Sequence, residues 1–142
     1  MINRIPLDEL KQQHHEIGEL IQVLSILLHD KSVRHTNTVF KLFEQLFTIV
    51  NHHLELEGKT LYPKLLVHKN KSMQEVAVRF LSGSISISKF FAKYIKDCQA
   101  WQTAADDNDT FIQATEEVFE FLQKRIKAEE EEFFALIRDN DR

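Results

Sequence analysis

Four stretches of this chain carry apolar residues at the three- and four-residue spacing of an amphipathic helix. The 142 residues include only three Gly and two Pro, the residues that most disfavour a helix interior. The connections between the stretches are short, which favours an up-down-up-down antiparallel four-helix bundle. We therefore predict an all-α fold forming one domain over residues 1–142. The expected helices cover about residues 6–29, 36–66, 72–101 and 109–138.

Each expected helix has a stripe of residues that should face the centre of the bundle. Pro63 should kink or end the second helix, because proline lacks an N–H and clashes with the preceding turn. Ser72 and Glu75 have the spacing of a capping box at the start of the third. The four stripes are Leu7, Leu10, His14, Ile17, Ile21, Leu24 and Leu28; Val39, Phe43, Leu46, Val50, His53, Glu57 and Leu61; Ala77, Phe80, Ser84, Ile87, Phe91, Tyr94, Cys98 and Trp101; and Phe111, Thr115, Val118, Leu122, Arg125, Glu129, Phe133 and Leu136.

The two halves of the chain repeat this pattern. The first stripe matches the third about 70 positions later, and the second matches the fourth about 72 positions later. Each half is therefore expected to be a helical hairpin of the same kind. The polar members that correspond in the two halves are His14 with Ser84, His53 with Arg125, and Glu57 with Glu129.

The polar members of the stripes should also share one level along the bundle. Residues equally far from a hairpin turn lie at about the same height in antiparallel helices, and by this measure His14 lies level with His53. Ser84 and Arg125 lie level with them across the second and third turns. Two His, two Glu and one Arg in a core of Phe and Leu are costly unless they satisfy one another. The sequence thus predicts one polar layer inside an apolar bundle.

The bulk properties narrow the class of protein. A formal charge of −4 argues against a general nucleic-acid-binding protein. The apolar runs are too short for a bilayer span, and the N-terminal segment lacks the apolar region of a signal peptide. Cys98 is the single cysteine and cannot form an intramolecular disulfide, which favours a reducing compartment. We expect a cytoplasmic protein with no nucleic-acid or membrane partner.

Three segments resemble the hemerythrin-like (HHE cation-binding) family: "HHEI" at 14–17, "HLELEGKTLYP" at 53–63 and, more weakly, "RIKAEEEEFFA" at 125–135. The resemblance spans nearly the whole chain. It implies two helical hairpins that hold a di-iron centre with histidines and two bridging carboxylates. The residues that match ligands of the family are His14, His53 and Glu57, with Glu129 at the second bridging carboxylate.

The second half of the chain departs from this family pattern. Ser84 and Arg125 stand where the resemblance implies histidines, and no histidine follows His68. Arg125 cannot ligate a metal, but its planar fork binds carboxylates. We expect it between Glu57 and Glu129, in the place of the lost cation, with the small Ser84 leaving room for it. One half of the site is thus expected to be intact and the other erased.

Three states of the polar layer remain open on the sequence. One metal ion is held by His14, His53, Glu57 and Glu129, or the layer is metal-free, or two ions are bound. Two imidazoles with a carboxylate and open positions suit non-haem Fe(II), although Zn(II) or Mn(II) would also fit. The first hypothesis is therefore a protein with one iron that senses or handles iron, dioxygen or nitric oxide.

The second hypothesis is a metal-free bundle that acts as a regulatory protein-binding module, with Arg125 replacing the metal. It would bind a partner or a second copy of itself through aromatic residues beside or off the stripes. An enzyme resembling the di-iron iron–sulfur repair proteins would need the missing histidines, and no acid–base pair is evident apart from the candidate ligands. The candidate aromatic residues are Phe40, Phe47, Phe90, Phe119 and Phe121.

Overall fold

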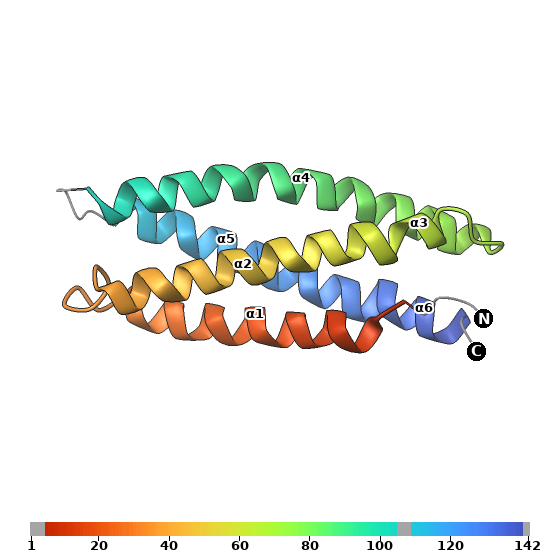
Figure 1. Cartoon of the computed structure of the whole chain (residues 1–142), viewed down its shortest axis with the longest axis horizontal. Coiled ribbons are helices and arrows are strands. Elements are labelled where there is room, and N and C mark those ends of the chain that lie inside the picture. Colours follow the sequence, from red (N-terminus) through yellow and green to blue (C-terminus); the bar gives the residue numbers. More distant parts are fainter. Residues whose placement is uncertain (1–4, 105–108, 141–142) are drawn as a thin grey trace.

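The structure, a computed structural model, describes residues 5–104 and 109–140, and all regular elements in these ranges are helical. Figure 1 shows α2 and α3 forming one rod, and α5, the π-helix η1 and α6 forming another, so that four rods run antiparallel. The prediction of an all-α, up-down-up-down four-helix bundle is confirmed. The elements are α1 (Leu7–Leu27), α2 (Asn37–Thr60), α3 (Tyr62–Leu65), α4 (Lys71–Gln102), α5 (Thr110–Ala128), η1 (Glu129–Phe134) and α6 (Ala135–Asn140).

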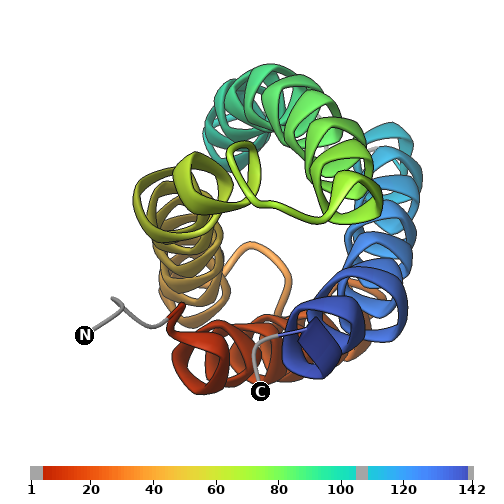
Figure 2. The same ribbon diagram turned by 90° about the vertical axis from the view of Figure 1, so that its right-hand side faces the viewer.

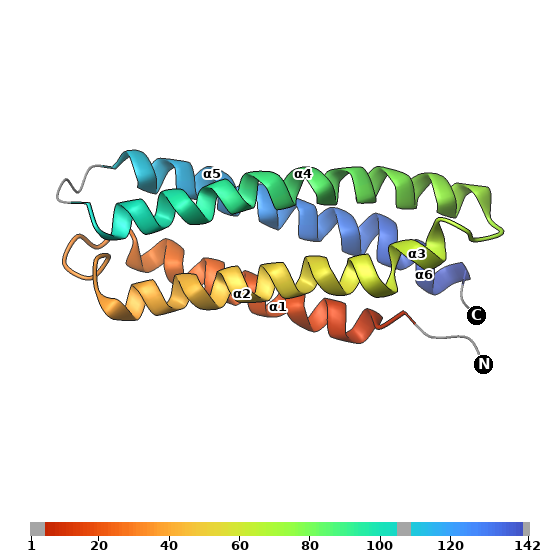
Figure 3. The same ribbon diagram turned by 45° about the horizontal axis from the view of Figure 1, so that its top comes forward.

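The four rods surround a common axis. In the end-on view of Figure 2, α1 lies beside α2 and α5, and α4 also lies beside α2 and α5. Figure 3 shows the two hairpins, α1–α2 and α4–α5, packed against each other along their length. This arrangement lets all four rods contribute side chains to one central layer.

The rod formed by α2 and α3 is broken as the sequence predicts. α2 ends at Thr60 and α3 begins at Tyr62, with Pro63 in the first turn, where its missing N–H costs nothing. The break leaves Tyr62 buried at 2 % exposure. Its hydroxyl is thereby available to the polar layer described below.

The start of α4 differs from the predicted capping box. Asn70 is the N-cap, and its side chain accepts hydrogen bonds from the backbone N–H groups of Ser72 (2.9 Å) and Met73 (3.3 Å). The prediction of a capping box formed by Ser72 and Glu75 is therefore wrong, because Ser72 already lies inside the first turn. An asparagine at the N-cap satisfies the same unpaired N–H groups.

A polar layer divides the apolar core into two clusters. One cluster contains Phe43, Phe91 and Trp101 near the turn between α1 and α2, and the other contains Leu10 and Phe80 at the opposite end. The polar layer between them consists of five of the buried polar residues, which come from all four rods. These five residues are His14, His53, Glu57, Ser84 and Glu129.

The first three predicted stripes are buried, apart from half-buried Leu7, whereas the fourth is rotated. Ile112 and Phe119 are 4 % and 3 % exposed, while Phe111 and Val118 pack against the core from its edge. α5 has adjacent apolar pairs at 111–112 and 118–119, so spacing alone cannot say which member faces the centre. Beyond the π-helix, Ile137 is buried in place of Leu136.

The aromatic residues proposed for a partner surface are only partly exposed. Phe47 packs edge-on against Phe91 between α2 and α4, and Phe119 is buried in the same core cluster. Their exposure was wrongly predicted, because both lie on the inner half of a wide apolar stripe. Phe121 is 42 % exposed, and Phe90 is half-buried, as is Phe40. No helix in the described ranges has the length and apolar character needed to cross a bilayer.

Candidate metal centre

Four side chains from three rods converge in the polar layer. His14 comes from α1, His53 and Glu57 come from α2, and Glu129 is the first residue of η1. Each is at most 5 % exposed, and one ligand-type atom from each lies within 4.8 Å of those of the others. The structure therefore brings together the four residues that the sequence predicts as ligands. That they bind a metal stays a prediction.

The donor atoms have the separations expected around one ion. Nε2 of His14 lies 3.0 Å from Nε2 of His53, and Oε1 of Glu129 lies 2.8 Å from the first and 3.2 Å from the second. Two ligands at right angles, each about 2.1 Å from a metal, are about 3.0 Å apart, whereas tetrahedral ligands are about 3.4 Å apart. The three atoms thus fit one face of an octahedron.

The outer nitrogens of both imidazoles are held by acceptors. His14 Nδ1 lies 2.7 Å from Oε2 of Glu130, and His53 Nδ1 lies 2.9 Å from Oε1 of Gln13. A carboxylate and an amide oxygen only accept, so each Nδ1 carries a hydrogen and donates it. In the neutral rings both Nε2 atoms then present lone pairs to each other and to Glu129. Three converging acceptors need a cation or a shared proton, and partners of this kind orient metal-binding histidines.

Glu57 is the least satisfied member of the layer. It is fully buried, and within the described part of the chain neither carboxylate oxygen has a hydrogen-bond partner. Its closest ionic neighbour is His53, with Oε2 3.2 Å from Nε2. Burial, together with the negative charge of Glu129 and despite His53, raises the pKa of Glu57 to about 7. A buried carboxylate without partners, aimed at three donors, fits a bound cation.

The charge of the layer also acts on His53 and Glu129. Burial opposes protonation of His53, but its hydrogen bond to Glu129 and the adjacent carboxylate of Glu57 outweigh it and raise the pKa of His53 to about 9. Burial likewise opposes ionisation of Glu129, yet hydrogen bonds with His14 and His53 hold the pKa of Glu129 well below its usual range. Without a metal, the layer therefore holds a proton on His53 at neutral pH.

Arg125 reaches the layer from α5 with its guanidinium directed inward. Nε donates to Oε2 of Glu129 at 2.9 Å, and Nη2 donates to the Phe80 carbonyl at 2.8 Å and the Tyr62 hydroxyl at 3.3 Å. The guanidinium carbon also lies 4.6 Å from the centre of the Phe80 ring. Glu129 thus has one oxygen on the histidine pair and the other on Arg125.

One detail of the predicted Arg125 site needs correction. Arg125 was expected between Glu57 and Glu129, but among the described residues its carboxylate partner is Glu129, and Glu57 belongs to the histidine side. Room for the guanidinium was assigned to Ser84, which is buried at 7 % exposure. A Cβ atom placed on Gly83 would lie only 2.5 Å from Arg125 Nη1. Gly83, one residue earlier, therefore provides space for the guanidinium. That Ser84 also leaves room for it stays a prediction.

We predict that Gly83→Ala lowers the stability of the fold, although alanine favours helix. The methyl group would displace a guanidinium that three hydrogen bonds hold, so we expect a net loss of about 1 kcal/mol in urea unfolding. Gly58→Ala is the matched control, because a Cβ there meets nothing within 4 Å. It should raise stability by about 0.5–1 kcal/mol. Equal gains in both variants would contradict the assigned role of Gly83.

The π-helix brings two consecutive carboxylates to one imidazole. η1 begins at Glu129, so Glu129 reaches Nε2 of His14 while Glu130 reaches Nδ1 of the same ring. A π-helical turn is wider than an α-helical one and often marks a functional site. Sequence spacing at 3.6 residues per turn places Glu130 on the outer face, which is why sequence reasoning missed it.

The layer also borders a small cavity of about 30 Å³. Its polar end is formed by His14, His53, Arg125 and Glu129, and the other side is apolar. A volume of this size holds one water-sized molecule. The apolar wall consists of Ile17, Val50, Leu54, Ile87, Leu122 and Ile126.

Comparison with known proteins gives one family match. A family model described as Hemerythrin HHE cation binding domain matches residues 5–137. No curated protein and no solved structure matches the chain. The match covers both helical hairpins and all four residues of the histidine–carboxylate cluster.

Proposed function

This chain belongs to the hemerythrin HHE cation-binding domain family, and we propose that it holds a single iron ion through His14, His53, Glu57 and Glu129. The observation that carries the proposal is the set of converging acceptors. Two imidazole nitrogens and a carboxylate oxygen lie 2.8–3.2 Å apart, beside a buried carboxylate with no hydrogen bond from any described residue. An ion at their centre would satisfy all of them.

A single ion is favoured over two by the position of Arg125. The guanidinium donates to the Glu129 oxygen that faces away from the histidines. It thereby supplies positive charge where a second ion would otherwise bind Glu129. Ser84, on the facing helix, has no imidazole to offer. In the second half of the site, the Arg125 guanidinium thus takes the place of a metal ion, which supports one ion per chain.

Iron is favoured by the donor set and its spacing. Two imidazoles and a carboxylate on one face, with open positions, are typical of non-haem Fe(II). Zn(II) prefers four ligands in a tetrahedron, for which the 3.0 Å separation of the two Nε2 atoms is short. Fe(II) would supply an ion that binds dioxygen or nitric oxide.

The role that we propose is the sensing or handling of iron or of a diatomic gas. The small cavity beside His14 and His53 has the volume for one such molecule and a mostly apolar wall. Arg125 and Glu129 lie at its polar end, where they would hold a bound molecule in place. The proposed setting is the cytoplasm, where Cys98, buried and unpaired, would stay reduced.

The test is metal content per chain, measured by plasma mass spectrometry after anaerobic loading with Fe(II) and desalting. We expect about one iron in the parent protein and less than about a tenth of that in His14→Ala and His53→Ala. His52→Ala is the matched control, because this neighbouring histidine is exposed and should keep full loading. Two ions per chain, or none in a folded protein, would contradict a single-iron site.

We also predict that metal affinity rises with pH. Ligands bind metal in their deprotonated forms, and the raised pKa of His53, about 9, means that a metal must displace its proton at neutral pH. Apparent affinity for Zn(II), measured by chelator competition, should rise about tenfold per pH unit between pH 7 and 8 and level off above pH 9. A flat profile would show that His53 is not a ligand.

A second candidate function is a metal-free module that binds a protein partner or a second copy of the chain. One observation favours it: Phe121 is 42 % exposed and packs edge-on against Phe90 beside a groove of about 410 Å³ on α4 and α5. The metal measurement separates the two candidates. A folded chain that takes up no metal would leave the partner-binding module.

A further inference from the structure

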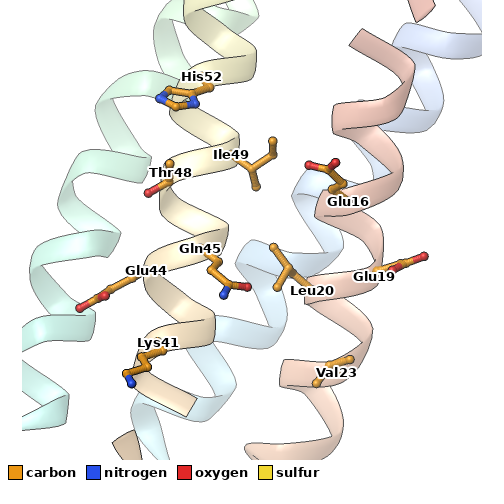
Figure 4. Close-up of a pocket in the computed structure, with 10 residues that line it drawn as sticks. All are labelled: Glu16, Glu19, Leu20, Val23, Lys41, Glu44, Gln45, Thr48, Ile49 and His52. Carbon is orange, nitrogen blue, oxygen red and sulfur yellow. The ribbon is translucent and has the colours of Figure 1, made fainter. Parts of the chain in front are cut away.

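A groove of about 740 Å³ runs along the outer side of the α1–α2 hairpin. Figure 4 shows Leu20 and Ile49 lying between the two helices, with Val23 further along α1. Val23 is 43 % exposed, so an apolar surface remains open to solvent here. The charged residues of the rims are Glu16 and Glu19 on α1, and Lys41 and Glu44 on α2.

The rims of this groove are predominantly acidic. The rims carry three carboxylates and one ammonium, and within the described part of the chain Glu16 and Glu44 form no ion pair. Glu19 pairs with the exposed His15. The groove continues past His52 into a second depression of about 270 Å³, where Glu9, Glu55 and Lys59 add to the rims. Glu55 and Lys59 are paired with each other at 2.6 Å, so the apolar floor and the excess of negative charge are concentrated in the larger groove.

We propose that this groove is a docking site for an amphipathic helix of a partner protein, with an apolar stripe flanked by Lys or Arg. A helix laid into a groove between two antiparallel helices buries its apolar stripe on the floor and places its flanking side chains over the rims. Leu20, Val23 and Ile49 form that floor. The excess of carboxylates selects a cationic partner and speeds its association.

The groove on α4 and α5 offers no comparable selection. Its apolar residues include Phe90 and Phe121, but its rim has two carboxylates and one lysine, a smaller excess of negative charge than in the α1–α2 groove. Lys93 there is already paired with Asp97 at 2.9 Å, and Glu117 is the remaining charge. Of these two surfaces, the α1–α2 groove is therefore the one whose charge indicates the chemistry of its partner.

The docking site goes beyond the proposed metal function and can fail separately from it. None of the four candidate ligands lines the groove. The groove residue nearest in sequence to a candidate ligand is His52, which lines both depressions and precedes His53. Metal content measured on the same samples therefore tests the metal site independently of docking.

The test uses Zn-loaded protein, which is diamagnetic, and a fluorescein-labelled synthetic peptide of about five helical turns with a leucine stripe flanked by lysines. Its dissociation constant is measured by fluorescence anisotropy. Two groove variants each have a matched control of similar exposure: Glu44→Lys with Glu117→Lys, and Val23→Ser with Val78→Ser, whose valine is 55 % exposed on α4. Zinc content and circular dichroism are recorded for every variant.

We expect Glu44→Lys and Val23→Ser to weaken peptide binding at least fivefold, with less than twofold changes in the controls. Amide chemical shifts should change along residues 16–23 and 41–52. A peptide with glutamate in place of lysine should not bind. Equal losses in groove variants and controls, or a loss in Glu44→Lys with none in Val23→Ser, would overturn the proposal, since either pattern indicates unspecific attraction of cations. Peptide binding by a chain without metal would support docking while contradicting the metal function.

Discussion

Replacing Glu57 by leucine is expected to abolish metal binding and, in the same variant, to stabilise the metal-free fold by about 1–3 kcal/mol. The carboxylate is fully buried, and neither oxygen is hydrogen-bonded to a described residue. Leucine has a similar volume and suits the apolar clusters on either side of the layer. The two opposite effects follow from one feature, because an unsatisfied buried carboxylate is costly until a cation binds it.

The measurement is a pair of urea unfolding curves with and without Zn(II), together with metal content. The parent protein should gain stability on metal addition, whereas the variant should be more stable without metal and unchanged by it. Glu55→Leu is the control on the same helix, since Glu55 is exposed and paired with Lys59; it should keep metal binding. A Glu57→Leu variant that is less stable than the parent without metal would show that Glu57 is satisfied in the metal-free fold.

The same variant has a defined pH signature. The folded pKa of Glu57, about 7, lies above the usual glutamate pKa of 4.5, so the folded state holds the proton more tightly than the unfolded chain. The destabilising effect of the ionised Glu57 carboxylate is therefore absent below about pH 4.5 and complete above about pH 7. The stability gap between Glu57→Leu and the metal-free parent should widen as pH rises through this range. A constant gap would contradict the raised pKa.

Arg125→Ala is expected to destabilise the protein by about 2–4 kcal/mol. The substitution removes the only described cation that donates to Oε2 of Glu129, and it leaves the Phe80 carbonyl and Tyr62 hydroxyl without this donor. It also removes the stacking of the guanidinium on the Phe80 ring. Breaking a buried charge pair leaves the remaining charge uncompensated, which accounts for the size of the effect.

Arg79 provides the matched control for this prediction. It lies over the same Phe80 ring, with 5.5 Å between its guanidinium carbon and the ring centre, and it pairs with Glu132 at 3.2 Å. Both partners of that pair are exposed, so Arg79→Ala should cost less than about 1 kcal/mol. Chemical denaturation at neutral pH measures both variants. Equal and small losses would show that Arg125 contributes no more than a surface ion pair.

Much of the fold and of the polar layer can be predicted from helical periodicity. Wherever one apolar residue marks each turn, as along α1 and α4, the buried face is unambiguous, and His14 and Ser84 fall on it. Antiparallel hairpins then fix the height of each polar residue from its distance to the turn. This is why the sequence alone predicts that His14, His53, Glu57 and Glu129 meet.

The contacts that sequence reasoning missed depend on departures from regular helix or on single atoms. The π-helix shifts the register after Ala128, so the reach of Glu130 to His14 has no counterpart in a 3.6-residue period. The space beside Gly83 becomes meaningful only once the path of the Arg125 side chain is known. The pairing of Gln13 with His53 depends on the rotation of both side chains, which spacing does not specify.

The division of the apolar core into two clusters has a consequence for the lifetime of the protein. The cluster at one end joins the start of α1, residues 61–65 and the segment around Phe133, and the polar layer separates it from the larger cluster. Without an ion in the layer, this end should open on its own, since local unfolding follows the weakest packing boundary. Proteases sample such openings. The amount of this protein in a cell would then follow the supply of its metal, because the chain without metal would be degraded faster.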